Sequence, residues 1–304
     1  MDTTVKNSFT TGPIVKPLLK FMLPVILALF LQAMYGAVDL LVVGRFATAD
    51  ISGVSTGSQA LQTITNVIVS FAMGITVTIG QQLGAKEPET VSQTISTGIL
   101  LFGVIGAILT IVMLIFAAPI ASLLNAPKPA FNQTVGYLRI CSMGSLIIIA
   151  YNLISSIFRG LGDSKTTLWT VMIACIFNII GDLVLVAIFH MGAQGAAIAT
   201  IVSQLISVIL SIQIIRHKNL PFHIHLKMDK ESLHRIIRVG FPIALQNFLV
   251  SLSFLAILMF VNALGVTASA GGGIAEKGLC LYHADSKCIH AIHVGFCCSK
   301  CRCP

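Results

Sequence analysis

Seven long apolar runs constrain the fold of this chain more than any other feature of its sequence. They cover residues 18–43, 52–80, 92–118, 130–157, 166–190, 192–215 and 236–264, and they are followed by the start of an eighth. Each run exceeds the ~20 residues that a helix needs to cross a bilayer, whereas the strands of a membrane barrel alternate in polarity over about 10 residues. Only 10% of the residues are charged, against about 25% in soluble domains. The sequence therefore predicts an all-α membrane protein, a multi-pass helical bundle.

Basic residues gather at one side of the predicted spans. That side holds Lys20, Lys86, Arg159, Lys165 and a cluster between 216 and 238, whereas the other side holds little beyond Arg45 and Lys128. By the positive-inside rule, the N-terminus and the loops after even-numbered spans are cytoplasmic, and we expect the chain to lie in the plasma membrane. The net charge of +8 thus indicates orientation and contact with anionic lipid, and does not indicate nucleic-acid binding.

Two carboxylates lie inside the apolar runs, where an Asp costs about 2.5–3.5 kcal/mol on insertion scales. They are Asp39 and Asp182. Asn178 lies one helical turn before Asp182, on the same face, so its amide can donate to that carboxylate. At 1.5 Å per residue, the two carboxylates and Thr200 lie roughly 9–14 Å below the same surface. The sequence therefore predicts one interior polar site; the alternative for Asp39 is a side chain that reaches water near Arg45.

The predicted carboxylate site suits a small cation. A carboxylate away from water favours its neutral form, and a second carboxylate nearby strengthens that preference. A proton, or a sodium ion held by oxygen atoms, would relieve the repulsion. We therefore expect a coupling ion, Na⁺ or H⁺, and neither an organic cofactor nor a resident metal. The histidines of the longest loop fit no metal-ligand spacing and are interpreted as solvated; they are His217, His223, His225 and His234.

The chain repeats itself weakly at a shift of 218 positions. Pro24 then aligns with Pro242, and Gly53 with Gly271. The shift spans six helices, and an even number gives both copies one orientation, as in transporters built from parallel repeats. We therefore expect a cytoplasmic N-terminal segment (1–16), a six-helix N-lobe (17–215), a cytoplasmic inter-lobe loop (216–235) and the first helix and start of the second helix of a C-lobe (236–277).

The last 27 residues, 278–304, differ in character from the rest of the chain. Six of the eight cysteines lie there, and no apolar run long enough to span a membrane remains. One interpretation is a metal-binding tail, in which the cysteines from Cys297 to Cys303 combine with His290 and His293. The other, which we favour, is translation in a wrong frame, because the change falls within a predicted helix. The C-lobe would then be truncated.

Four segments resemble the MATE (multidrug and toxic compound extrusion) family. They are MYGAVDLLVVGR at 34–45, FRGLGDSKTT at 158–167, NIIGD at 178–182 and GAQGAAIAT at 192–200. The resemblance implies a transporter of twelve helices in two lobes that exports organic cations and other drugs by antiport with Na⁺ or H⁺. It also implies a cation-binding network made of Asp39, Asn178, Asp182, Thr200 and Tyr35.

Three functions are open at this point, and none is enzymatic, because the sequence has no nucleophile–base pair, phosphate loop or metal triad. The first is a MATE-type drug antiporter that is inactive in this truncated form, since a single lobe lacks the opposite wall of a midline cavity. The second is a lipid-linked flippase, which would need more cavity cations than Arg139. The third is a membrane fragment that transports nothing. The expected partners are the bilayer and a small-molecule substrate, with the oligomeric state left open.

Overall fold

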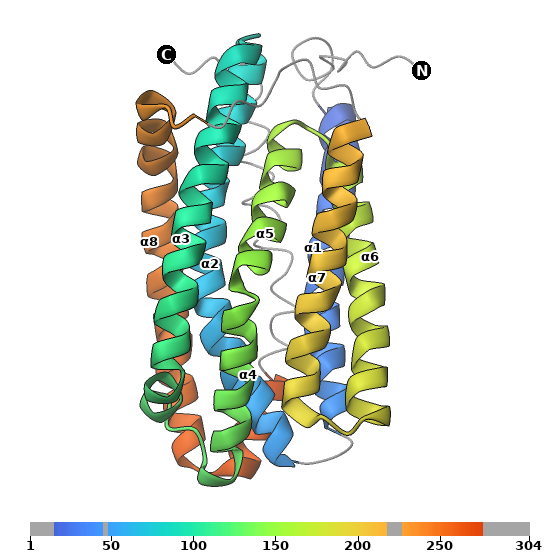
Figure 1. Ribbon diagram of the computed structural model, residues 1–304, viewed down its shortest axis with the longest axis vertical. Helices are drawn as coiled ribbons and strands as arrows, with labels where there is room; N and C mark the ends of the chain where they lie inside the picture. Colours follow the sequence, from blue (N-terminus) through green and yellow to red (C-terminus); the bar gives the residue numbers. More distant parts are fainter. Residues whose placement is uncertain (1–14, 45–47, 218–226, 276–304) are drawn as a thin grey trace.

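Long helices run up and down along a common axis in the computed structural model (Figure 1), which describes residues 15–44, 48–217 and 227–275. These residues contain no β-strand. The α-helices are α1 (Val15–Val43), α2 (Thr48–Gly84), α3 (Pro88–Leu123), α4 (Phe131–Met143), α5 (Ser145–Gly160), α6 (Ser164–Asp182), α7 (Gly192–His217) and α8 (Lys230–Ala263). A short 3₁₀ helix, η1 (Lys128–Ala130), precedes α4, a π-helix, η2 (Leu183–Ile188), continues α6, and residues 266–275 are again helical. The predicted all-α bundle is confirmed.

Six of the described helices are long and apolar enough to cross a membrane, and α4 with α5 would make a seventh span bent by 58°. The span predicted over 130–157 thus corresponds to this bent pair, because the helix breaks at Gly144. A Cβ at this position would lie 2.5 Å from the side chain of Ile201 on α7. Gly144 and Ser145 form the kind of small pair at which helices kink, and only glycine fits this close approach.

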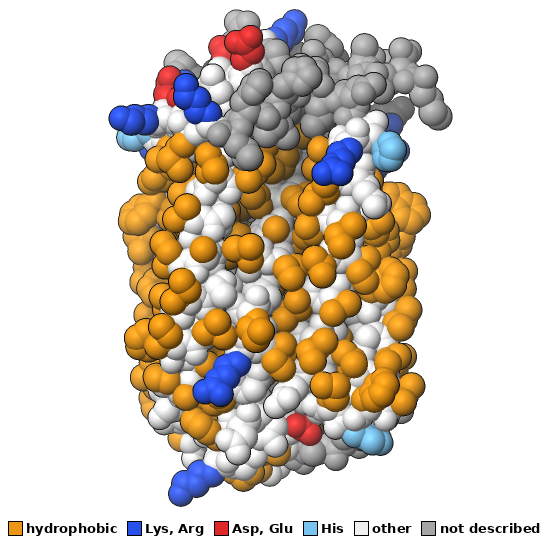
Figure 2. Space-filling model, viewed as in Figure 1, with side chains coloured by type: hydrophobic (Ala, Val, Ile, Leu, Met, Phe, Trp, Pro, Cys, Tyr) orange, Lys and Arg blue, Asp and Glu red, His pale blue; other side chains and the backbone are white. Residues whose placement is uncertain are grey.

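The polarity of the bundle is inverted relative to a soluble protein. The flank of the molecule is covered by apolar side chains, while charged side chains gather towards its upper end (Figure 2). Large side chains such as Ile115 on α3 and Phe260 on α8 are exposed, whereas many small polar side chains, including Ser96 and Ser156, are fully buried. Outward apolar and inward polar groups are what a bilayer-spanning bundle requires. The chain is a multi-pass membrane protein.

Helix α8 packs along the whole length of α2, in the antiparallel direction. Near one end, Gly74 lies against the backbone of α8, since a Cβ there would be 2.6 Å from the Ile236 carbonyl oxygen. At the other end, the buried Asn262 side chain donates to the Leu124 carbonyl oxygen (2.8 Å) and accepts from the Ser269 hydroxyl (2.7 Å). Close glycine contacts and inter-helix hydrogen bonds are typical of helix association in lipid.

Several sequence predictions concern residues at the ends of the bundle. The end at which α5 stops and α6 starts carries the basic residues Lys86, Arg159, Lys165, Arg216 and Lys230. His217 and His234 lie in the described part, which contains no group of three or more His, Cys, Asp or Glu side chains able to hold a metal. His223, His225, Arg45 and the tail 278–304 lie outside the described residues, so both interpretations of the tail stay predictions.

Candidate functional site

One of the two predicted carboxylates, Asp182, lies at a change of helix type. Asp182 is the last residue of α6, just before the π-helix η2. In η2 the Phe189 N–H donates to the Val184 carbonyl oxygen (3.0 Å), five residues back. π-Helical segments of this kind widen a helix locally and are frequent at functional sites. The sequence contained no signal for it, because 183–188 is simply apolar.

Helices α6 and α7 approach closely beside Asp182. A Cβ on Gly181 would lie 2.9 Å from the Ala199 Cβ on α7, so glycine permits the contact. The Asn178 amide donates to the Thr200 hydroxyl (3.4 Å), which in turn donates to the Ala196 carbonyl oxygen (3.0 Å). The expected donation from Asn178 to Asp182 is therefore wrong, since the amide turns across the helix contact instead of along its own helix.

The carboxyl groups of Asp39 on α1 and Asp182 on α6 lie beside each other. Asp39 is 5% exposed and Asp182 is 0% exposed, so both side chains lie inside the bundle. The alternative in which Asp39 reaches water is therefore wrong. Apart from the Asp39 carboxyl, no group among the described residues hydrogen-bonds either carboxylate oxygen of Asp182. Two carboxyl groups can bond to each other only when one of them carries a proton.

Tyr35, the last residue of the predicted set, lies beside one residue that the sequence analysis did not include. It lies one turn before Asp39 on α1, is half-buried, and sits beside Gln204 of α7 as well as Asp39. Sequence reasoning missed Gln204, although it lies at i+4 from Thr200 and therefore on the same face of α7. It also missed Tyr137 of α4, which is 3% exposed and lies near Asp39. That residue falls in the span whose break was not predicted.

The site is rich in buried oxygen atoms that lack donors. They are both carboxylate oxygens of Asp182, the amide oxygen of Asn178 and the amide oxygen of Gln204. A buried acceptor without a partner costs about 1–3 kcal/mol, so native structures usually supply a water or an ion. Carboxylate, amide and hydroxyl oxygens are the ligands of hard cations. Asp39, Asp182, Asn178 and Thr200 are thus the residues of this chain that fit a small cation.

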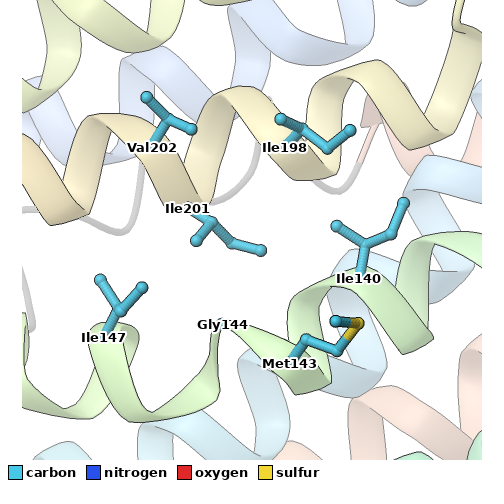
Figure 3. Close-up of a pocket in the computed structure, with 7 residues that line it drawn as sticks. All are labelled: Ile140, Met143, Gly144, Ile147, Ile198, Ile201 and Val202. Carbon is cyan, nitrogen blue, oxygen red and sulfur yellow. The ribbon is translucent and has the colours of Figure 1, made fainter.

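A separate cavity of about 370 Å³ lies where α4 bends into α5 beside α7. Figure 3 shows Ile140, Met143 and Ile147 on one side of it and Ile201 and Val202 on the other. Its lining side chains are all apolar. It therefore offers no ligand for an ion, and is distinct from the carboxylate site.

Comparison with known proteins gives consistent matches. The MatE family model matches residues 24–184. The chain is 31% identical over 281 residues to the probable multidrug resistance protein YpnP of Bacillus subtilis (strain 168), covering 88% of this chain and 61% of that protein. It is 28% identical over 268 residues to the probable multidrug resistance protein YoeA of the same strain, covering 84% and 58%. The chain therefore spans about three fifths of the length of these curated relatives.

A solved structure shows the same fold at lower identity. The MATE multidrug transporter DinF-BH, solved in complex with a ligand, superposes with a TM-score of 0.88 at 20% sequence identity. The match covers 97% of this chain and 67% of that structure. At this identity the likeness supports the arrangement of the helices, and does not extend to the ligand.

Proposed function

The chain belongs to the MatE family, and its relatives YpnP and YoeA are described as probable multidrug resistance proteins; from this premise we propose that it exports small organic cations and other drugs by antiport with Na⁺ or H⁺. The membrane is the plasma membrane, with the basic end of the bundle and the N-terminus on the cytoplasmic side. The observation that carries the proposal is the buried contact between Asp39 and Asp182. Such a pair inside a membrane protein marks an ion pathway or relay.

The carboxyl pair gives a small cation a defined place. Two negative charges in contact repel strongly where water is excluded. A proton on one carboxyl turns the repulsion between Asp39 and Asp182 into a hydrogen bond. A sodium ion would instead take oxygen ligands from Asp182, Asn178 and Thr200; the last two side chains meet across the α6–α7 contact. Either cation lowers the charge of the pair from −2 to −1, so each would compete with a cationic drug for the same negative charge.

Ion occupancy is coupled to helix position because the two carboxyl groups belong to different helices. Asp39 is carried by α1 and Asp182 by α6, at its junction with η2. With one cation bound, the repulsion between the two carboxylates is relieved and α1 is drawn against α6; without the cation, repulsion favours separation. A ligand drives a conformational change only through a difference in affinity for two states, and this contact supplies one. In a two-lobe transporter the result is alternating access.

The lipid-linked flippase is less well supported. Such a protein needs cations around its substrate headgroup, yet the Arg139 side chain lies exposed on the outer flank of α4. The interior oxygen atoms of Asp182 and Asn178 favour a cation over an anionic headgroup. The carboxyl-rich interior therefore favours drug–cation exchange.

The test compares two isosteric substitutions in everted membrane vesicles. The vesicles come from cells that lack their own drug pumps and express this chain joined after Lys277 to the second half of YpnP. An imposed Na⁺ or H⁺ gradient across the vesicle membrane then drives transport of a cationic dye. Asp182→Asn should abolish gradient-driven efflux, because an amide cannot take up a proton or balance the charge of a cation.

The matched control for this experiment is Ser96→Ala, which removes a fully buried hydroxyl of α3 that bonds only to its own helix. Its efflux should equal that of the unaltered protein. Both proteins must be present in the membrane at equal levels. Unchanged efflux by Asp182→Asn would refute the role of the carboxyl pair.

A further inference from the structure

Among the buried polar groups outside the cation contact that lack hydrogen-bond partners, two lie between that contact and the basic end of the bundle. They are the amide oxygen of Gln204 and the hydroxyl of Tyr151, whose side chains are 6% and 3% exposed. Gln204 lies one turn beyond Thr200 along α7, about 6 Å further from the carboxyl pair. Both side chains lie on the part of the bundle that leads from Asp182 towards the basic end.

Tyr151 stands where four helices meet. Its side chain packs with Ala28 of α1 and with Val171 and Ala174 of α6, with Val208 of α7 against the same cluster. The Tyr151 side chain also lies near that of Tyr35, which itself sits beside Gln204. Buried hydroxyls of Thr170 and Ser207 lie next to Val171 and Val208, but both donate to backbone carbonyl oxygens, whereas the Tyr151 hydroxyl has no partner.

The charged group further in this direction is Arg159, which also lies near Tyr151. It is eight residues further along α5, about 12 Å by helical rise, and is half-buried at the basic end. Its guanidinium donates to the Ser156 hydroxyl (3.0 Å) and to the Ser155 carbonyl oxygen (3.3 Å). Polar groups of α5 and α7 thus follow one another from the carboxyl pair to the end of the bundle.

Unpartnered buried oxygens in native proteins are usually met by ordered water, which bonds to two or more such groups. We propose that ordered water joins Gln204, Tyr151 and Arg159 into an internal path for protons between the Asp39–Asp182 pair and the basic end of the bundle. The inference rests on the proposed antiport, and it assigns H⁺ as the ion that uses this route.

A proton needs only a chain of hydrogen bonds: each water or hydroxyl accepts one proton and passes on another, so no group along the path changes its net charge. The carboxyl pair takes up or releases the one proton that moves.

Hydroxyl-radical footprinting of this chain in lipid nanodiscs tests for the water directly, because buried residues are modified only where water adjoins them. Tyr151 should be modified at a rate close to that of the half-buried Tyr35. Phe102, 1% exposed within the apolar cluster of α2, α3 and α5, is the dry reference; rates are corrected for intrinsic reactivity. Gln204→Leu should lower the rate at Tyr151 towards that of Phe102. Equal rates at Tyr151 and Phe102 in the unaltered chain would overturn the path.

A transport measurement tests whether the proposed path carries protons during efflux. In the vesicle assay, Tyr151→Phe should slow the maximal rate of H⁺-driven efflux and leave the apparent affinity for the dye unchanged, while Thr134→Val, which removes a buried hydroxyl bonded within α4, should change neither. An unchanged maximal rate in Tyr151→Phe would refute the path. Footprinting does not depend on transport, so the two proposals can fail separately. If Tyr151 is hydrated but the Asp182→Asn variant still transports the dye, the proposed antiport is refuted and the water path is not.

Discussion

Replacing Asp182 by asparagine should stabilise the bundle even as it removes the proposed cation site. Neither carboxylate oxygen of Asp182 has a donor other than the Asp39 carboxyl, and the side chain is completely buried. Asparagine has nearly the same shape, so it adds no packing strain. Its NH₂ group can donate to the Asp39 carboxylate, and a hydrogen bond to a charged group contributes about 1.5–3 kcal/mol.

We therefore expect the free energy of unfolding of Asp182→Asn to rise by about 1.5–3 kcal/mol at alkaline pH, where repulsion within the Asp39–Asp182 pair is removed and a hydrogen bond is gained. The rise should be smaller at acid pH, because there a shared proton already gives the native pair its bond. A functional site that lowers stability is a common trade-off.

The assay is reversible unfolding in mixed micelles with increasing SDS, followed by the fluorescence of Trp169. This is the chain's single tryptophan, and it lies on α6, the helix that carries Asp182. Glu231→Gln is the matched control, since it makes the same chemical change on an exposed side chain that pairs only with Arg235 within its helix; its effect should stay below about 1 kcal/mol. A loss of stability in Asp182→Asn would show that the Asp182 carboxylate has favourable partners, and would refute the reasoning.

Two further predictions concern α8. Asn262→Ala should lower the free energy of unfolding by about 2 kcal/mol, since it removes hydrogen bonds with Leu124 and Ser269 that contribute about 0.6–1.7 kcal/mol each in membrane proteins. The control is Ser253→Ala on the exposed face, which should leave the midpoint of SDS unfolding unchanged. Equal midpoints for the two variants would contradict the prediction. The Asp229 side chain caps α8 by accepting a hydrogen bond from the Ser232 N–H (2.7 Å). Hydrogen bonds from the backbone and side chain of Ser232 lower the pKa of Asp229. The stabilisation from Asp229 is therefore present above the usual aspartate range and lost as pH falls through the lowered pKa; amide exchange in the first turn of α8 should rise there, and an Asp229→Asn variant that keeps the same acid response would refute it.

The sequence predicted the helices of the site because apolar length and isolated charges are strong signals in a membrane protein. Asp39 and Asp182 interrupt apolar runs, and the helical rise gave them a common depth, which the contact in the structure explains. The partner of Asn178 could not be derived in the same way. Its amide has both Asp182 along the helix and Thr200 across it within reach, and the close α6–α7 approach at Gly181 decides between them.

The break at Gly144 and the π-helix η2 were missed for a related reason. Both lie in continuous apolar sequence, and a hydropathy pattern does not register a change in helix geometry. At Gly144 the cause lies on another element, because Ile201 of α7 occupies the space that a side chain would need. Such features depend on contacts between distant residues, so a single sequence reveals them only after the helices are placed.

One contact in the structure joins two residues that are equivalent in the weak internal repeat. A Cβ at Gly273 would overlap the Ser55 hydroxyl oxygen, and these residues are separated by the repeat shift of 218. In a two-fold arrangement a residue meets its own equivalent only on the axis, so the predicted repeat would place its axis here. By the same shift α8 is the counterpart of α1, and α2 lies along α8. The second helix of a complete C-lobe would then lie along α1.

Helix α1 would thus connect the carboxyl pair with the interface between lobes. One of its sides carries Asp39 towards Asp182, and its other side presents the exposed Leu23, Leu27 and Phe30. In the proposed antiporter, a cation that binds the pair would hold α1 against α6, and a shift of α1 would move the surface that faces the second lobe. Ion occupancy would therefore reach the drug pathway through one helix, with no need for a chain of intermediate contacts.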